Sequence, residues 1–413
     1  MKKNIWIINH YAIPPSMGGL VRHTYFSKYL IQKGYEVKLF TSSKIHNTNI
    51  NVIKDNSLYN EIEIDGMKYT FIKSGNYTNN GLARIKNLLE FPKNLGKTVK
   101  KFNRPDIIYT SSPDIFTAFK SIKIARKFHV PCITEIRDLW PESIISYNKI
   151  SKNNPVIKIL FRLEKWIYKK SDALIFTMEG GKDYIIEKRW DKAVDLKKIY
   201  NINNGIDINE FNYNKENYII NDDDLNNADK FKIIYTGSIR KVNNLSTIIS
   251  TAEYLQNENY KDIIFIIYGD GSEKDDLIKR CCDENIGNVV FKGRVEKKYI
   301  PYILSKADLN LYHWMQTPLM RFGSSGNKLF DYLASGRPIL STVNSEYDII
   351  EKNNAGLISK DQTPSEIAKT ILKVYNASNE EYTALCDNAL YLAKDFDYEI
   401  LTDKLISIIE NIR

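Results

Sequence analysis

The order strand, loop, helix, strand occurs twice in this chain, once in each half. The first copy is predicted at residues 5–9, 10–19, 20–33 and 37–41. The second copy is predicted at residues 232–236, 237–244, 245–256 and 263–268. Because parallel strands are joined through crossover helices, each copy predicts a parallel sheet with helices on both faces. We therefore expect an α/β protein with two doubly wound domains.

The length of the chain also requires two domains, because 413 residues exceed one ordinary core. Further strands are predicted at residues 107–110, 132–136, 173–176, 289–291, 309–312 and 339–341. The boundary is expected near residue 205, because the polar stretch at 208–230 has little to bury. The expected domains are 1–205 and 206–390, and a helical segment at 391–413 is expected to pack back on the first.

In doubly wound sheets, ligands bind beyond the carboxyl ends of the strands. Two such domains facing each other would place these loops around one interdomain cleft. The candidate site is therefore sought in the loops that follow Asn9, Ile136, Thr236 and Tyr268, and in the segment 323–338.

The segment 323–338 reads as a loop of small residues that opens a short helix. Asn327 is the expected N-cap, Gly336 the C-terminal stop, and Pro338 prevents continuation. Lys328 then lies in the first turn, where the helix dipole disfavours a cation by about 0.3–1 kcal/mol. One interpretation is that an anion such as a nucleotide diphosphate shares the site, with Asp331 facing the same way. The other is a solvated ion pair between Lys328 and Asp331 on a surface helix.

In the first half, Gly18 and Gly19 join the first strand to its helix. Paired glycines let a ligand approach the backbone, and the following helix N-terminus favours phosphate, although a simple tight turn would look the same. His10 lies at the carboxyl end of the first strand, where a base or a sugar-binding group is expected, unless it is a structural histidine.

Four charges lie within eight residues at the end of the strand 132–136. Burying so many charges is costly, which favours the lip of a cleft over a core position. Here Asp138 is a candidate for polarising an acceptor hydroxyl, and Arg137 for holding a phosphate. The alternative is an arginine–carboxylate network that braces the loop.

The loop after Thr236 carries Arg240 and Lys241, which are candidates for diphosphate oxygens or else solvated surface charges. Gly269 and Gly271 form a sharp turn after the next strand, where backbone can pack against a base or ribose. Arg294 follows the strand at 289–291, in a segment suited to framing a nucleobase.

The net charge of +9 fits a phosphate compound, an anionic membrane or a nucleic acid. Residues 82–104 carry seven basic residues against Glu90, among apolar positions. We interpret this stretch as contacting an anionic membrane surface, against the alternative of an ordinary helix with a basic solvated side. A nucleic-acid partner is disfavoured, because no recognition motif occurs.

The cysteine pattern and the hydropathy bear on location. Cys132, Cys281, Cys282 and Cys386 show no CxxC pair and no metal-ligand spacing, which favours a reducing cytosol and predicts no metal site. No segment approaches the roughly 20 apolar residues needed to span a bilayer. We expect a cytoplasmic protein, peripheral at the inner face of the cell membrane.

Taken together, these segments resemble glycosyltransferase family 4, which has the GT-B architecture of two facing Rossmann-like domains. The motifs that carry the resemblance, in chain order, are Gly18-Gly19, Arg137-Asp138-Leu139-Trp140-Pro141, Asn204-Gly205-Ile206-Asp207, Tyr235-Thr236-Gly237, Gly269-Asp270-Gly271, Phe291-Lys292-Gly293-Arg294 and the segment 327–338. The segments 137–141 and 327–338 are especially similar to bacterial O-antigen and capsule transferases, including those that move N-acetyl-L-fucosamine.

The resemblance implies transfer from a nucleotide sugar, most readily a UDP-sugar, to a lipid-linked glycan. It implies retention at the anomeric carbon, with no metal ion or cofactor. Lys328 would neutralise the leaving diphosphate, and Asp331 would correspond to the second carboxylate of the family's E-x7-E motif, which holds the ribose. Gly323 stands where that motif has its first Glu, so backbone amides of 323–327 are expected to replace it. Ser238 and Asn243 stand where the family has Arg and Lys.

The residue patterns and the resemblance together give the candidate residues. The catalytic candidates are Asp138, Lys328, Arg240 and His10. The donor-binding candidates are Gly18, Gly19, Gly237, Ser238, Lys241, Gly269, Gly271, Arg294, Ser324, Ser325, Asn327 and Asp331. The acceptor-binding candidates are Arg137 and Trp140. Two other functions stay open, a sugar-nucleotide epimerase of the same architecture and a non-catalytic, membrane-associated partner of another transferase.

Overall fold

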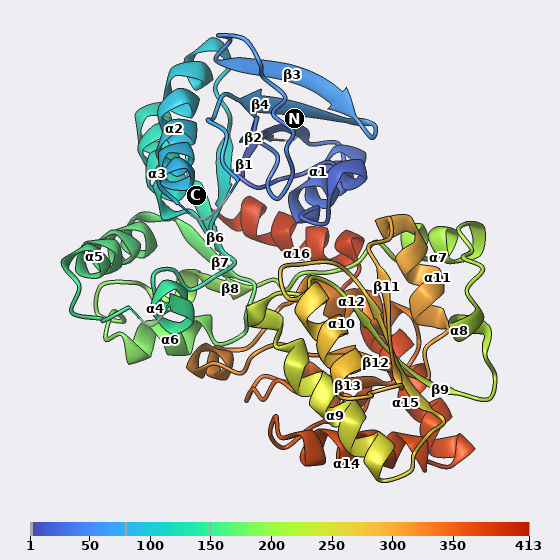
Figure 1. The fold of residues 1–413 in the computed structure, drawn as a ribbon. Coiled ribbons are helices and arrows are strands. Elements are labelled where there is room, and N and C mark those ends of the chain that lie inside the picture. Colours follow the sequence, from blue (N-terminus) through green and yellow to red (C-terminus); the bar gives the residue numbers. More distant parts are fainter. Residues whose placement is uncertain (1–2, 79–80, 149, 413) are drawn as a thin grey trace. The chain divides into compact units, whose positions relative to one another are not determined.

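The computed structural model describes residues 3–78, 81–148 and 150–412. The chain divides into two compact units, one of Met1–Asn203 with Tyr398–Arg413 and the other of Asn204–Asp397. Figure 1 shows that each unit combines a sheet with helices, so the predicted α/β fold is confirmed. The chain returns to unit 1 at Tyr398, later than the residue 391 expected from the sequence.

The sheet of unit 1 has the order β3-β4-β2-β1-β5-β6-β7-β8. Its strands are β1 (Asn4–Ile8), β2 (Glu36–Ser42), β3 (Tyr59–Ile64), β4 (Met67–Ile72), β5 (Ile107–Ser111), β6 (Cys132–Ile136), β7 (Ala173–Phe176) and β8 (Ile199–Asn201). All neighbouring strands are parallel except β3 and β4. The chain order reverses between β1 and β5, which makes this the switch point of the sheet.

The hairpin of β3 and β4 was not predicted, although the sequence carries a signal for it. Asp65 and Gly66 join the two strands with φ angles of 53° and 72°, the left-handed pair that a tight hairpin turn requires. The short edge strand β8 was also missed, because three residues give too little periodicity to detect.

Helices cover the sheet of unit 1, with α1 and α16 packed together (Figure 1). The helices are α1 (Arg22–Gln32), α2 (Leu82–Thr98), α3 (Ile115–Phe128), α4 (Glu142–Asn148), α5 (Pro155–Lys170), α6 (Gly181–Glu187) and α16 (Tyr398–Asn411). Phe26 of α1 and Leu405 of α16 share one core with Ile5 and Ile7 of β1. The C-terminal helix is therefore an integral part of this core.

A buried charge network lies inside unit 1 at the end of β6. The Glu135 carboxylate accepts hydrogen bonds from Arg22 Nε at 2.8 Å, from Ser111 Oγ at 2.8 Å and from the Tyr109 hydroxyl. His23 Nε2 lies 3.2 Å from the same carboxylate. Burial alone would raise the pKa of Glu135, but Arg22 and His23 outweigh it and hold the pKa well below its usual range.

The sheet of unit 2 is parallel and has the order β11-β10-β9-β12-β13-β14. Its strands are β9 (Phe231–Thr236), β10 (Ile263–Tyr268), β11 (Val289–Gly293), β12 (Leu309–Tyr312), β13 (Ile339–Ser341) and β14 (Gly356–Ile358). Five of these strands were predicted, and β14 was not. The switch point lies between β9 and β12, so the loops after these strands are where a ligand is expected.

Two hydrophobic cores cover the two faces of this sheet. Ile264 and Ile266 of β10 belong to one core, while Phe265 and Ile267 belong to the other. This double burial explains the continuous apolar run of β10, because both faces of a parallel sheet are covered by helices. The helices are α7 (Ile208–Asn217), α8 (Asp223–Asn226), α9 (Leu245–Asn257), α10 (Lys274–Asp283), α11 (Ile300–Ser305), α12 (Asn327–Ala334), α13 (Ile349–Lys352), α14 (Pro364–Tyr375) and α15 (Asn379–Lys394).

The expectation that residues 208–230 have little to bury is wrong. Phe211 of α7 and Leu225 of α8 are 2% exposed and belong to a core of unit 2. Asp222 accepts hydrogen bonds from the Tyr268 hydroxyl at 2.7 Å and from Lys292 Nζ at 2.8 Å, which ties the stretch to β10 and β11. Polar composition concealed these anchors, because each helix has only one fully buried apolar side chain.

The network around Glu135 predicts the effect of a single substitution. Glu135→Gln leaves the Arg22 charge buried without its partner, so we expect the free energy of unfolding to fall by about 3–5 kcal/mol at pH 7. Because the pKa of Glu135 is depressed, wild type keeps this advantage as the pH falls, and the difference should persist at pH 5. Urea denaturation of both proteins measures it. Glu63→Gln, on the exposed side of β3, is the control, and an equally small effect of both changes would contradict the prediction.

Candidate functional site

Lys328 is positioned by the first turn of α12. Gly326 is the N-cap of this helix, and no side chain caps it, so the expectation that Asn327 is the N-cap is wrong. Asn327 is instead the first helical residue and is exposed. Leu329 and Phe330 are buried in a core of unit 2, which fixes the rotation of the helix and leaves Lys328 half-buried.

The ammonium group of Lys328 lies against the end of β9. Its Nζ donates a hydrogen bond to the Tyr235 hydroxyl at 2.9 Å and lies 4.1 Å from the centre of the Tyr235 ring. The Tyr235 hydroxyl in turn donates to the Ser238 carbonyl at 2.9 Å. This chain of contacts directs Lys328 to the loop after β9. The alternative of a solvated pair between Lys328 and Asp331 is therefore not what the structure shows.

The surroundings of Lys328 disfavour its protonated form. Burial, together with the positive charge of Arg240, lowers the pKa of Lys328 to about 7. The charges that act on Asp331 are a different set. Burial raises the pKa of Asp331 from its usual value, while Lys297 opposes the rise. The two residues are thus one turn apart on α12 but belong to different surroundings.

The loop after β9 brings Gly237, Ser238 and Arg240 to Lys328. A Cβ atom added to Gly237 would lie 2.7 Å from Lys328 Nζ, so the ammonium group rests directly on this backbone. Ser238 Oγ donates to Asn243 Oδ1 at 2.8 Å, so these two residues, which replace the family's Arg and Lys, pair with each other. Arg240 is exposed and acts on Lys328, whereas Lys241 is exposed and does not.

Gly269 and Gly271 are required by a crossing of two loops. A Cβ atom at Gly269 would lie 1.8 Å from the Gly237 carbonyl oxygen, and one at Gly271 would lie 2.2 Å from the Ile239 carbonyl oxygen. Backbone hydrogen bonds of 2.9 Å from Gly237 N and Ile239 N link the same loops. The two glycines therefore allow the loop after β10 to pack directly against the loop after β9. This packing supports the Gly237 backbone that Lys328 contacts.

The loop at 323–326 has a conformation that excludes a family-type glutamate. Gly323 has a φ of 95°, in the region that favours glycine. The Ser324 hydroxyl lies 3.3 Å from the Tyr312 hydroxyl, which also accepts a hydrogen bond from Gly326 N at 3.2 Å. The Trp314 ring fills the space where Gly326 would carry a side chain. Arg294 follows β11 and is exposed.

In unit 1, His10 is buried and held on both sides. Its Nδ1 lies 3.1 Å from an Asp114 carboxylate oxygen, and its Nε2 lies 2.7 Å from Asn87 Oδ1. His10 is 3% exposed, and Asp114 caps α3 at the switch point between β1 and β5. This arrangement is that of a structural histidine, and the catalytic role of His10 stays a prediction.

The two charged residues of the loop after β6, Arg137 and Asp138, have different surroundings. Arg137 is in the field of the Glu135 network, and burial lowers its pKa. Burial raises the pKa of Asp138, whose carboxylate accepts a hydrogen bond from Ser143 Oγ at 3.1 Å. Trp140 is half-buried, and its ring contacts Phe116. Gly18 and Gly19 lie in a different loop, the one after β1, and Gly19 is exposed. The acceptor-side roles of these residues stay predictions.

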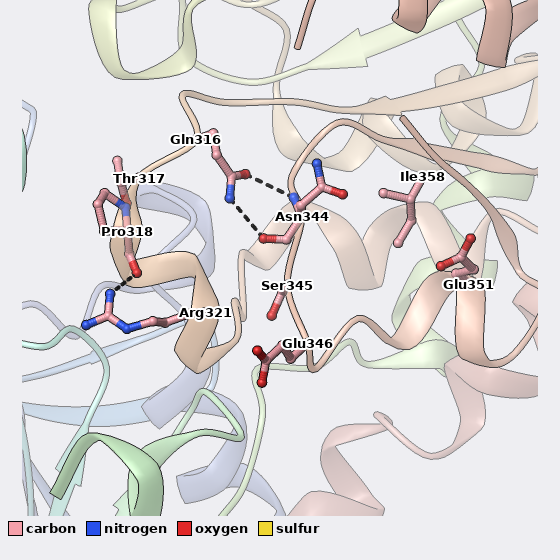
Figure 2. A pocket seen from close by; sticks show the side chains of 9 residues that line it. All are labelled: Gln316, Thr317, Pro318, Arg321, Asn344, Ser345, Glu346, Glu351 and Ile358. Atoms are coloured by element: carbon pink, nitrogen blue, oxygen red, sulfur yellow. Dashed lines mark hydrogen bonds between the residues drawn. The ribbon is translucent and has the colours of Figure 1, made fainter. Parts of the chain in front are cut away.

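A hollow of about 550 Å³ lies elsewhere in unit 2 (Figure 2). Its walls come from the segments after β12 and β13, from α13 and from β14, and it is lined by Gln316, Thr317, Pro318, Arg321, Asn344, Ser345, Glu346, Glu351 and Ile358. The Gln316 side chain bridges two of these segments through hydrogen bonds with the Asn344 backbone at 2.9 and 3.0 Å. The hollow contains none of the predicted site residues.

Sequence reasoning missed the residues that support Lys328. Tyr235 directly precedes the Thr236-Gly237 motif, but its role depends on a contact with a helix far along the chain. His313 is also nearby: burial, together with the charge of Lys328, lowers the pKa of His313 to about 4, and its Nε2 donates to the Asn244 carbonyl at 3.0 Å. An aromatic residue at the end of a strand was the available signal for Tyr235, and His313 carried none.

Comparison with known families accounts for most of the chain. The family described as Glycosyltransferase Family 4 matches residues 17–210, and the family described as Glycosyl transferases group 1 matches residues 230–377. The chain belongs to the glycosyltransferases. A curated relative, an uncharacterized glycosyltransferase of Methanocaldococcus jannaschii, is 24% identical over 217 residues, and this match spans 52% of each chain.

Solved structures with the GT-B fold are similar over nearly the whole chain. Sucrose-phosphate synthase from Thermosynechococcus elongatus has a TM-score of 0.73 at 15% identity, covering 99% of this chain and 98% of that one. Anabaena HepE in complex with UDP and glucose has a TM-score of 0.68 at 12% identity, covering 98% and 99%. A UDP-forming trehalose-phosphate synthase from Burkholderia xenovorans has a TM-score of 0.71 at 11% identity, covering 100% and 99%.

Residues 3–78, 81–148 and 150–412 contain neither a membrane-spanning helix nor a cluster of metal-binding side chains. No helix in these ranges has the length and apolar character to cross a membrane. No group of three or more His, Cys, Asp or Glu side chains in these ranges is placed to hold a metal ion.

The pKa of Lys328 predicts how the affinity of this site for an anionic ligand, with UDP as the probe, depends on pH. UDP should favour the protonated amine and raise its pKa in the complex, so binding takes up a proton once the pH exceeds about 7. We expect the dissociation constant for UDP to rise with pH above 7, by up to about tenfold per unit. Calorimetry in buffers with different ionisation heats measures both the affinity and the proton uptake.

Lys328→Arg is the control for this prediction, because arginine stays charged throughout the range. Its affinity for UDP should vary much less between pH 7 and 9. A wild-type affinity that does not change over this range would contradict the assignment of Lys328.

Proposed function

We propose that this chain is a retaining glycosyltransferase that moves a hexose or an N-acetylated deoxyhexosamine from a UDP-sugar to a lipid-linked glycan. The proposed setting is bacterial surface-polysaccharide assembly, as the likeness to O-antigen and capsule transferases suggests. The observation that carries the proposal is the placement of Lys328, which is held on Tyr235 beside Arg240 at the switch point of unit 2. Two cations forced together at this position suit an anionic ligand of high charge.

The proposed roles follow from this geometry. Lys328 and Arg240 would neutralise the charge that develops on the leaving diphosphate, which supplies without a metal what a cation supplies elsewhere. Asp331, whose pKa is raised by burial, would accept hydrogen bonds from the ribose hydroxyls. Backbone amides of 324–327 would contact the donor sugar, because Gly323 leaves no carboxylate there.

The proposed reaction keeps the anomeric configuration. The bond between the anomeric carbon and the diphosphate oxygen breaks, and the acceptor oxygen bonds to the same face of that carbon. The acceptor proton passes to the departing diphosphate oxygen. An inverting reaction would instead need a base in unit 1. Asp138 would suit that role better than His10, because its pKa is raised toward neutrality while His10 is enclosed by Asp114 and Asn87.

The experiment is a UDP-release assay over a panel of UDP-sugars, with and without a lipid-linked acceptor and with and without a chelator. We expect release that depends on the acceptor and persists with the chelator. Lys328→Ala should lower kcat/KM at least 100-fold, the usual effect of removing one donor to a developing anion. Lys279→Ala, an exposed lysine of α10, is the control.

The other outcomes separate the alternatives. Conversion of the UDP-sugar in the absence of acceptor, with no release of UDP, would favour the epimerase. The absence of UDP release with every donor and acceptor, and of any conversion of the donor, would favour the non-catalytic partner. An inverted product, observed by NMR, would contradict retention. Full activity of both Lys328→Ala and Asp331→Ala would contradict the site.

The proposal includes contact with an anionic membrane through the outer face of α2. Leu82, Ile85 and Leu89 are 84%, 52% and 49% exposed, and their spacing places them on one side of the helix. Lys86, Lys93 and Lys97 share that side and are exposed. Apolar side chains flanked by lysines suit the boundary between lipid headgroups and acyl chains. This face would hold the enzyme close to a lipid-linked acceptor.

Sedimentation with vesicles tests the α2 face. Wild type should sediment with vesicles rich in phosphatidylglycerol, less with neutral phosphatidylcholine, and less at high salt. The triple change Leu82→Ser, Ile85→Ser and Leu89→Ser should abolish the binding, whereas Ile31→Ser and Ile186→Ser, at exposed positions on α1 and α6, should not. Equal binding of the triple variant and wild type would rule out this surface.

A further inference from the structure

The loop before α12 depends on distant residues for its conformation. No side chain caps the helix at Gly326, and Gly323 gives the loop backbone freedom at its start. Tyr312 holds Ser324 and Gly326 from one side, through its hydroxyl. The residue between them, Ser325, is held by neither Tyr312 nor the helix.

Asn204 supplies the missing contact with two hydrogen bonds. Its backbone N donates to Ser325 Oγ at 2.7 Å, and its side-chain Nδ2 donates to the Ser325 carbonyl. Asn204 is 5% exposed, and its Oδ1 is buried with no hydrogen-bond partner among the described residues. A buried amide that leaves its oxygen unpaired carries a desolvation cost, so the Nδ2 contact with the Ser325 carbonyl is the evident reason for an asparagine here.

The residues just before Asn204 are themselves fixed within unit 1. Arg22, whose Nε binds Glu135, donates through its other nitrogens to the carbonyls of Ile202 and Asn203. Asn203 Nδ2 donates to Glu179 Oε1 at 2.5 Å. The chain is therefore fixed within unit 1 up to Asn203, the residue before Asn204.

We propose that Asn204 is a positioning residue that clamps the loop 323–327 at Ser325 and so sets where the donor sugar lies. This inference rests on the proposed function, in which amides of this loop replace the glutamate that Gly323 excludes. Backbone amides can orient a sugar only if the loop is held within a fraction of an ångström. Lys328 and Asp331 lie in the helix beyond the clamp, so the nucleotide contacts should not depend on it.

The test compares Asn204→Ala, Asn204→Asp and Ser325→Ala with wild type. Asparagine and aspartate have the same shape, but the aspartate side chain cannot donate to the Ser325 carbonyl and would repel it. Ser325→Ala keeps the carbonyl contact and loses only the Oγ contact. Asn388→Ala, which removes an amide-to-carbonyl bond to Asn354 elsewhere in unit 2, is the control.

We expect hydrogen exchange in the peptide 323–328 to speed up at least tenfold in Asn204→Ala and Asn204→Asp. With a productive donor, kcat should fall 10- to 100-fold in both, and less in Ser325→Ala. The dissociation constant for UDP should change less than threefold, which a general loss of structure would not allow. The control should match wild type in all three measurements.

Unchanged exchange and unchanged kcat in Asn204→Ala would overturn the proposal. Should Asn204→Ala fail to fold, Ser325→Ala decides, because faster exchange with unchanged UDP affinity supports the clamp and wild-type exchange refutes it. Failure of wild type to bind UDP would contradict the proposed function, and the exchange comparison would still decide whether Asn204 holds the loop.

Discussion

Lys328 and Arg240 lie close enough to repel each other, and the ammonium group of Lys328 has a phenol rather than a carboxylate as its hydrogen-bond partner. A protein usually relieves such repulsion with an acidic side chain. In the proposed function this relief comes from the diphosphate of the donor, and the repulsion then contributes to the affinity for that anion. The rest of the site keeps Lys328 in this position. The first turn of α12 points its side chain toward β9, and the Tyr235 hydroxyl accepts a hydrogen bond from its ammonium group. The loop at Gly237 packs against the same ammonium group and is itself supported by the loop at Gly269.

The fold followed from the apolar strands because both faces of a parallel sheet are buried. A run such as Ile263–Tyr268 leaves no alternative to a central strand, and its bounds were predicted correctly. Elements with weak sequence signals were not predicted. The hairpin of β3 and β4 alternates only partly and is joined by Asp65 and Gly66, a turn signal that was overlooked. The single apolar anchors Phe211 and Leu225 cannot be recognised in a polar stretch without knowledge of the core that receives them.

Part of the candidate site could be predicted from the sequence, because a lysine in the first turn of a helix is electrostatically unfavourable and Lys328 occupies such a position. Its partner Tyr235 lies 93 residues away, and no local rule connects the two. The same limit applies to Asn204 and Ser325, which are joined across 121 residues. The cap was misassigned for a different reason: Asn327 has a suitable side chain, but the helix begins one residue earlier, with Gly326 as an N-cap that has no side chain to reveal it. Sequence shows which groups are chemically unusual, whereas tertiary contacts decide what they touch.

The low pKa of Lys328 has a chemical side as well as an electrostatic one. An amine that has lost its proton carries a free electron pair and behaves as a nucleophile. Near neutrality a substantial share of Lys328 is in this form, while ordinary surface lysines stay protonated. The residue should therefore be the most readily acylated lysine of its unit, and an occupied site should shield it. If the donor is the proposed UDP-sugar, an electrophile built on a uridine scaffold would acylate Lys328 selectively.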